Sequence, residues 1–278
     1  MRIKVWSNSV SSPISGFGSK FYYTLAGLVE LGYDVKITPK NPDIIVDHPV
    51  LMKMRGRCAY VSVEGPTELK EIRAETIVAS SRFVARMLGV EKVVPIGVPK
   101  LCENKEEEFD IGVVVSPSPV KLHLVRKGID LYIKFLKRYR GRVICSSFLE
   151  KKAVCSYYTD DTVEIYSTSR LLLFLSRSEG FGLPVAEAMS CGTPVVYLDA
   201  PAVNEFACCW PIPARYAGIA TDPEVNQLKA IIYEPVADIR WIVERALRQI
   251  INGRLPKVSY PYRPRDSALL LLKSCGIV

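Results

Sequence analysis

The 278-residue sequence lacks any run of about 18 or more apolar residues, so no segment is expected to cross a membrane as a helix. Only two histidines occur, and they do not suggest a Ser/His/Asp or Cys/His catalytic set. There is no P-loop and no cysteine spacing of the zinc-binding kind. Hydrophobic residues make up 49% of the chain, enough to bury one large core or two modest ones.

The eight cysteines include no CxxC pair, and the adjacent Cys208 and Cys209 suit neither a metal site nor an easy mutual disulfide. The N-terminus shows no signal-peptide pattern, so we expect a cytoplasmic protein with mainly buried thiols. Isolated disulfides are the alternative. Only two glutamines stand beside many Lys, Arg and Glu. That composition hints at a hot habitat, where intracellular disulfides are more common.

The net charge of +8 is spread along the chain and forms no concentrated basic stripe, so a nucleic-acid partner is not expected. A surplus of this size suits a phosphorylated ligand or peripheral contact with an anionic membrane, at the inner membrane surface. Lys53, Arg55 and Arg57 could form a surface-docking loop, although a plain solvated loop is the favoured interpretation.

Residues 1–99 alternate between strand and helix patterns, which predicts an α/β domain with a doubly wound parallel sheet. The expected strands are 3–6, 34–38, 42–47, 58–63, 76–79 and 92–95, and the expected helices are 21–29, 68–73 and 82–88.

After a charged run at 103–110 that is typical of a linker, a second alternation begins, which predicts a second Rossmann-like domain over 100–278. Its last helix, 265–278, could pack back on the first domain. The expected strands are 111–115, 142–145, 152–155, 171–175 and 195–196, and the expected helices are 130–139, 223–233, 235–251 and 267–275. In such pairs of domains the ligand lies in the cleft between them, at the carboxyl ends of the strands.

The segment 177–189, RSEGFGLPVAEAM, predicts a strand, a glycine turn and a helix. Gly180 and Gly182 leave backbone N–H groups accessible at the start of the helix, where an anion or a sugar oxygen can bind. Glu179 ends the loop and Glu187 lies about one turn into the helix. Both carboxylates are therefore expected to face the same pocket.

Three further features are candidates. Gly16 and Gly18 lie in a loop after the first strand, but the dinucleotide fingerprint is incomplete, which disfavours an oxidoreductase. Arg126 and Lys127 are expected to open a helix, where cations oppose the helix dipole; that cost favours a ligand role over a solvated one, more for Lys127 than for Arg126. His48 follows a strand and is either a cleft residue or structural.

The order SEGFGLP, EAM and GTPVV, continuing to Glu205, resembles the signature of family 4 retaining glycosyltransferases, which use nucleotide sugars and have the GT-B fold. The glycine loop at 15–18, the serines after 79, the hinge at 94–98 and Lys127-Gly128 resemble other parts of the same family. The likeness covers residues 1 to about 205 and is specific mainly in its second half.

The resemblance implies a role for each matching residue. Glu187 would bind the donor ribose, and Glu179 would bind the transferred sugar together with the backbone amides of Phe181, Gly182 and Leu183, beside Gly180. Lys127 would neutralise the leaving diphosphate, and Gly16 and Gly18 would allow the backbone to approach the phosphates. No cofactor or metal is implied: the donor would be a nucleotide-diphosphate sugar, UDP- or GDP-linked, and Glu179 and Lys127 would be the catalytic residues.

Two departures from the family pattern stand out. Ser116 lies where the family has a phosphate-binding arginine, for which Arg126 or Lys121 could substitute. Glu64 lies near the place of a family histidine, so Glu64 and His48 are the acceptor-side candidates. The acceptor could be lipid-linked, a glycan or a protein. Two other functions stay open: a binding protein of the same fold without turnover, and a GT-B epimerase.

Overall fold

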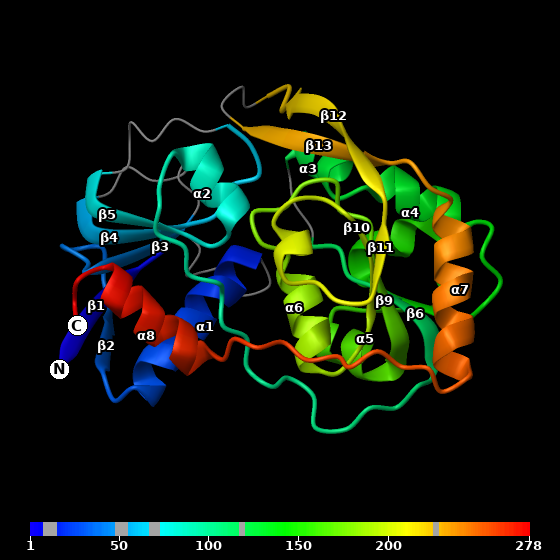
Figure 1. Cartoon of the computed structure of the whole chain (residues 1–278), viewed down its shortest axis with the longest axis horizontal. Coiled ribbons are helices and arrows are strands. Elements are labelled where there is room, and N and C mark those ends of the chain that lie inside the picture. The colour runs from blue at the N-terminus through cyan, green and yellow to red at the C-terminus, as the bar shows by residue number, and fades with distance from the viewer. Residues whose placement is uncertain (8–15, 48–54, 67–72, 117–119, 225–227) are drawn as a thin grey trace.

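The computed structural model describes residues 1–7, 16–47, 55–66, 73–116, 120–224 and 228–278. The chain forms two α/β lobes that lie side by side (Figure 1). The N-terminal lobe contains β1 to β5 with α1, α2 and α8, and the C-terminal lobe contains β6 to β13 with α3 to α7. The two Rossmann-like units expected from the alternating pattern are therefore present.

The sheet of the N-terminal lobe has five parallel strands in the order β2-β1-β3-β4-β5. The strand bounds are β1 Arg2–Trp6, β2 Asp34–Ile37, β3 Ile44–Asp47, β4 Arg55–Val61 and β5 Arg73–Ala79. Helix α1 spans Gly16–Glu30 and α2 spans Arg82–Leu88. The expected strand at 92–95 is reduced to a single bridge at Val93, and the expected helix at 68–73 is wrong at its end, because Arg73 already begins β5.

The sheet of the C-terminal lobe has six parallel strands in the order β11-β10-β9-β6-β7-β8. The strand bounds are β6 Phe109–Val113, β7 Val143–Ser146, β8 Tyr157–Thr159, β9 Ser169–Phe174, β10 Val195–Leu198 and β11 Trp210–Ile212. The helices are α3 Lys121–Arg126, α4 Ile129–Leu136, α5 Thr162–Thr168, α6 Leu183–Ser190 and α7 Ile239–Ile251, with short 3-10 turns at Ser147–Lys152 and Val203–Glu205. The predicted strand at 152–155 is therefore wrong.

Two long strands outside both sheets form an antiparallel ribbon, β12 Ala214–Thr221 with β13 Lys229–Pro235. The expected helix at 223–233 is wrong, because β13 occupies its second half. The residues of β13 alternate in burial, as one face of a ribbon does, and a short apolar run of this length does not distinguish a helix from a strand by periodicity alone.

Helix α8, Pro264–Ser274, returns from the C-terminal lobe and packs on α1 (Figure 1). The contact is close: a side chain at Gly27 of α1 would lie 2.1 Å from the carbonyl oxygen of Pro264. The returning segment also runs along the hinge at 95–98, where Tyr260 Oη donates to Ile96 O at 2.6 Å and Ser267 Oγ donates to Pro95 O at 2.7 Å. Two chain crossings, rather than one linker, thus connect the lobes.

Three disulfides contradict the expectation of mainly free thiols. Cys58 in β4 bonds Cys275 after α8, Cys102 in the crossing segment bonds Cys191 after α6, and Cys145 in β7 bonds Cys155. The first two pairs are 217 and 89 residues apart, so only the folded chain brings their Cα atoms within 5.6 Å and 4.9 Å. Cys208 and Cys209 remain thiols.

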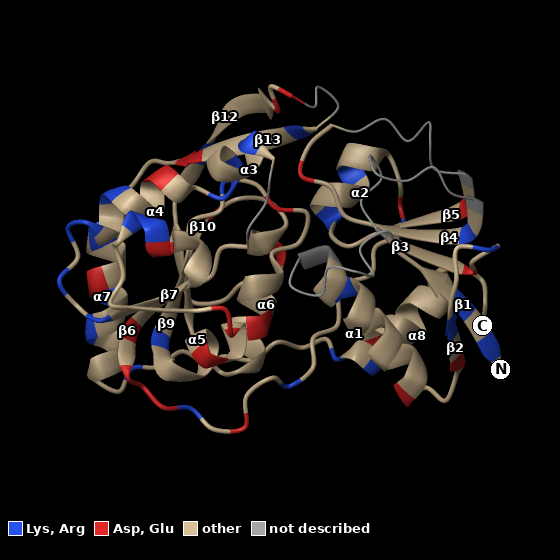
Figure 2. Cartoon of the chain, turned by 180° about the vertical axis from the view of Figure 1, so that it is seen from behind, with Lys and Arg blue, Asp and Glu red and all other residues tan. Residues whose placement is uncertain are grey.

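Lys and Arg lie over both lobes and are interspersed with Asp and Glu (Figure 2). Among the described residues, no helix is long and apolar enough to cross a membrane.

Candidate active site

The loop between β9 and α6, residues 175–182, carries the glycine-rich motif at the carboxyl end of β9. Gly182 has φ +99° and is the N-cap of α6, a left-handed conformation that glycine adopts without strain. Pro184 lies in the first helical turn, where its missing N–H removes no hydrogen bond. The predicted strand, turn and helix are confirmed at this place.

Glu179 in this loop forms a buried ion pair with Lys127: Lys127 Nζ donates to Glu179 Oε1, and the two side chains are 14% (Lys127) and 8% (Glu179) exposed. Burial lowers the pKa of Lys127, and the neighbouring Arg126 lowers it further, whereas Glu179 acts in the opposite direction. The structure therefore brings together the two residues predicted to be catalytic.

Arg126 and Lys127 come directly before α4, as expected, but they also end a helix that was not expected: Arg126 is the last residue of α3 and Lys127 is its C-cap. Gly128, at φ +66°, ends this helix and starts α4. A side chain there would lie 2.2 Å from Leu175 O, so glycine is required where the α3–α4 turn meets the end of β9. The cations thus lie at the carboxyl end of α3, which favours them, and also just before the start of α4, which does not, so the helix dipoles alone do not single out a ligand role.

Arg126 connects the two lobes. Its Nη1 donates to Glu64 Oε1 at 2.7 Å, and the two side chains are 15% (Arg126) and 13% (Glu64) exposed. Glu64 follows β4 of the N-terminal lobe. Lys121, the other candidate for the missing arginine, instead pairs with Glu224 at 2.7 Å in an exposed position. Of the two candidates, Arg126 is the one that lies beside Lys127 and Glu179.

His123, for which no role was predicted, is part of this cluster. Its Nε2 lies 2.6 Å from Ser116 O, an acceptor, so Nε2 carries the proton and Nδ1 accepts from Arg126 Nη2 at 3.2 Å. Burial, together with the charges of Arg126 and Lys127, lowers the pKa of His123 to about 4. A neutral His123 therefore connects Arg126 to the backbone carbonyl of Ser116.

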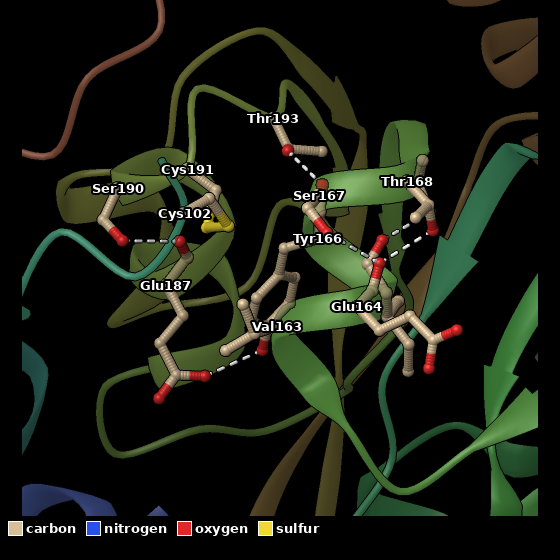
Figure 3. The surroundings of a disulfide bond; sticks show 12 residues. Cys102, Val163, Glu164, Tyr166, Ser167, Thr168, Glu187, Ser190, Cys191 and Thr193 are labelled. Carbon is tan, nitrogen blue, oxygen red and sulfur yellow. Dashed lines mark hydrogen bonds between the residues drawn. A yellow bond between two sulfur atoms is a disulfide. The ribbon is translucent and has the colours of Figure 1, made fainter. Parts of the chain in front are cut away.

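Glu187 on α6 is buried, at 7% exposure, and both of its carboxylate oxygens accept hydrogen bonds from tyrosines. Tyr166 Oη of α5 donates to Oε2 at 2.7 Å, as Figure 3 shows, and Tyr23 Oη of α1 donates to Oε1 at 2.8 Å. Burial raises the pKa of Glu187, while the two tyrosine hydrogen bonds lower it. The disulfide Cys102–Cys191 fixes the end of the same helix to the crossing segment (Figure 3).

The glycine loop itself contacts the N-terminal lobe. Gly180 O accepts from Ser80 Oγ at 3.1 Å and from Ser81 Oγ at 2.9 Å, both just beyond β5. A side chain at Gly180 would lie 2.9 Å from the backbone N and O of Val63, so this close approach requires glycine. Ser178 Oγ donates to Glu64 O at 2.8 Å. The carboxyl ends of β4, β5 and β9 therefore meet at this loop.

Lys20 is a further residue that sequence reasoning missed. It lies on α1, two residues after Gly18, at 1% exposure. Its Nζ donates to Tyr60 O at 3.0 Å and to Ser62 Oγ at 3.1 Å. Ser62 Oγ in turn donates to Ser80 Oγ at 2.7 Å, which continues the chain of hydrogen bonds to Gly180. Its place one turn into a helix gives no sequence signal of this contact.

The remaining predicted residues are distributed as follows. Gly16 and Gly18 lie in the first turn of α1. Phe181 and Leu183 point into the core, where the Phe181 ring stacks on Phe206 with centroids 4.7 Å apart. His48 lies outside the described residues. No group of three or more His, Cys, Asp or Glu that could hold a metal ion is found in the ranges that the structure covers.

This architecture is the GT-B fold. The structure superimposes on AviGT4, a glycosyltransferase involved in avilamycin A biosynthesis, with a TM-score of 0.61, 14% identity, and coverage of 99% of this chain and 97% of the other. It superimposes on Anabaena HepE in complex with UDP and glucose with a TM-score of 0.54 and 12% identity, over 99% and 95% of the two chains.

Residues 148–232, which lie in the C-terminal lobe, match the family model of glycosyl transferases group 1. The protein named "Putative glycosyltransferase ORF330" of Acidianus filamentous virus 2 is 28% identical over 193 residues, 58% of this chain and 56% of its own length. The O-antigen chain mannosyltransferase B of Escherichia coli is 35% identical over 83 residues, 30% of this chain and 20% of its own. The match to ORF330 thus spans about half of that relative.

Proposed function

We propose that the protein is a retaining glycosyltransferase that moves a sugar from a nucleotide-diphosphate sugar to an acceptor without a metal ion. The observation that carries the proposal is the pair of buried cations, Arg126 and Lys127, next to the glycine loop of the group 1 domain. Adjacent guanidinium and ammonium groups match the charge and geometry of a diphosphate. UDP- and GDP-sugars are the donors we propose.

In the proposed step, the acceptor hydroxyl oxygen attacks the anomeric carbon on the face that the diphosphate leaves. The bond between the anomeric carbon and the phosphate oxygen breaks, and the hydroxyl proton passes to that departing oxygen. Because the acceptor attacks from the face that the diphosphate leaves, the configuration is retained. Negative charge then builds up on the nucleoside diphosphate. Arg126 and Lys127 stabilise this charge in a site from which water is largely excluded, where such stabilisation is strongest.

The other roles follow from the carboxylates and the glycines. Glu179 and the backbone N–H groups of the loop would bind the hydroxyls of the transferred sugar, and Glu187 would bind those of the ribose. Gly16 and Gly18, in the first turn of α1, would let the backbone approach the phosphates.

On the acceptor side we propose Glu64 and His48. The net charge of +8 supports an acceptor or a membrane surface that is anionic, such as a lipid-linked acceptor at the inner surface of a cytoplasmic membrane. The proposal also includes a glycan or a protein as the acceptor, and an activity assay with each kind of acceptor distinguishes them.

A second function, nucleotide or glycan binding without turnover, is favoured by one observation. Both candidate phosphate-binding cations are already neutralised, by Glu64 and by Glu179. A binding protein would show saturable ligand binding and no product with any acceptor.

The test begins with thermal unfolding in the presence of UDP, GDP and ADP, because a ligand that binds the native state raises its stability. Release of nucleoside diphosphate from UDP- and GDP-sugars is then measured with polyprenyl phosphate vesicles, oligosaccharides and peptides as acceptors. We expect Lys127→Ala to lower kcat by about a hundredfold or more. The exposed Lys134→Ala on α4 is the matched control and should keep full activity. Absence of nucleotide binding by the wild type would refute the proposal.

A further inference from the structure

Two of the donor-binding groups proposed above, Glu187 and Arg126, are held by a side chain of the opposite lobe. Glu187, the proposed ribose ligand, accepts from Tyr23 Oη of α1 at 2.8 Å. Arg126, a proposed diphosphate ligand, is paired with Glu64 at 2.7 Å. Tyr23 and Glu64 come from different parts of the N-terminal lobe, so two independent contacts lead to the same arrangement.

The chemistry of these contacts matches that of the donor. A tyrosine hydroxyl donates one hydrogen bond to a carboxylate, as a ribose hydroxyl does. A carboxylate oxygen accepts from a guanidinium, as a phosphate oxygen does. Tyr23 thus makes the hydrogen bond expected of a ribose, and Glu64 makes the ion pair expected of a diphosphate.

Glu187 and Arg126 have few free hydrogen-bonding positions left for an incoming nucleotide sugar. Glu187 is 7% exposed, and each of its oxygens already accepts a hydrogen bond. The two terminal nitrogens of Arg126 contact Glu64 and His123. His123 is neutral and stays bound to Ser116, whereas Glu64 carries the charge that a diphosphate would replace.

We propose that Tyr23 and Glu64 occupy the donor site from the N-terminal lobe and are exchanged for the ribose and the diphosphate when the donor binds. The proposal rests on the function proposed above. Tyr23 would compete with the ribose for Glu187, and Glu64 would compete with the diphosphate for Arg126. Glu64, once exchanged, becomes available to the acceptor.

The competition predicts that loss of an occupant tightens ligand binding. We therefore measure the Kd of UDP, GDP and inorganic pyrophosphate by calorimetry for wild type, Tyr23→Phe and Glu64→Gln. Tyr23→Phe should tighten the nucleoside diphosphate about tenfold, the effect of one hydrogen bond to a charged group, and leave pyrophosphate unchanged. Glu64→Gln should tighten both ligands about tenfold.

Two controls separate competition from other effects. Tyr166→Phe removes the second tyrosine from Glu187, but Tyr166 belongs to the same lobe as Glu187, so we expect weaker rather than tighter nucleotide binding. Glu205→Gln removes one carboxylate at the lobe interface that contacts α2 and no proposed donor group, so pyrophosphate affinity should not change. Tyr23→Leu and Glu64→Ala serve as second variants with the same expectations, should either first variant fail to fold.

The outcomes separate the two proposals. If the wild type binds a nucleoside diphosphate and the variants bind it equally or more weakly, the exchange is wrong and the proposed function stands. If Glu64→Gln and Glu205→Gln tighten pyrophosphate equally, the effect is one of net charge, and the exchange is wrong. If neither wild type nor variants bind any nucleoside diphosphate, both proposals are wrong.

Discussion

The disulfide between Cys58 and Cys275 should contribute more to stability than any local crosslink. It joins β4 to the end of α8 and closes a loop whose ends are 217 residues apart. In the chain-entropy relation, a loop of this length corresponds to about 5 kcal/mol at 25 °C, and the loop of 10 residues closed by Cys145 and Cys155 to about 3 kcal/mol. We therefore expect Cys58→Ala/Cys275→Ala to lower the free energy of unfolding by about 2 kcal/mol more than Cys145→Ala/Cys155→Ala.

The two double variants are well matched, because each removes one fully buried strand cysteine, Cys58 or Cys145. Urea unfolding without reductant, followed by circular dichroism, gives the midpoint and slope for each protein. Wild type in reductant provides the limit with all three bonds open. An equal or smaller loss for the Cys58/Cys275 variant would refute the reasoning from loop length.

Three further predictions concern single residues. In the unfolded chain His123 has a pKa near 6.5, whereas in the folded chain its pKa is about 4. Between these two pH values the unfolded chain binds a proton at His123 and the folded chain does not. The free energy of unfolding therefore falls by about 3 kcal/mol as the pH is lowered through this window. The midpoint of urea unfolding should fall less steeply with pH in His123→Gln than in the wild type, and parallel curves for the two proteins would contradict this. Glu205 accepts from the backbone N–H groups of Arg82 and Phe83 at the start of α2, so Glu205→Ala should cost about 1 kcal/mol in urea unfolding, and Glu205→Gln less. Gly128→Ala should lower stability by about 2 kcal/mol or more in thermal unfolding, because of the positive φ and the contact with Leu175 O; an unchanged Tm would contradict it.

The features predicted correctly from the sequence are those that short segments of the chain determine by themselves. The alternation of strands and helices in each lobe, the strand and turn before α6, and the positions of Glu179 and Lys127 follow from short segments of sequence. The β12–β13 ribbon was missed because it forms only by pairing between residues such as Ala214 and Pro235. Helix α3 was missed because it is only six residues long and no side chain caps its start at Val120, so its sequence carries no helix-start signal.

The site contacts that were missed are those between residues far apart in the chain. Tyr23 and Glu187 are 164 residues apart, and Glu64 and Arg126 are 62 apart. The contact between His123 and Arg126 is local, but its significance depends on Ser116 and on the burial that packing creates. No periodicity or spacing in the sequence encodes such contacts, because they depend on how the two lobes come together.

The contacts that join the lobes also determine the chemistry of the site. Two cations and two carboxylates lie at the lobe interface with exposures of 8–15%, and each cation is paired with a carboxylate. Removing one partner of such a buried pair leaves an uncompensated charge, which costs more than the pair contributes. If the exchange proposed above takes place, a diphosphate that replaces Glu64 on Arg126 breaks an ion pair between the lobes, because Glu64 belongs to the N-terminal lobe. Donor binding would then be coupled to lobe separation by charge.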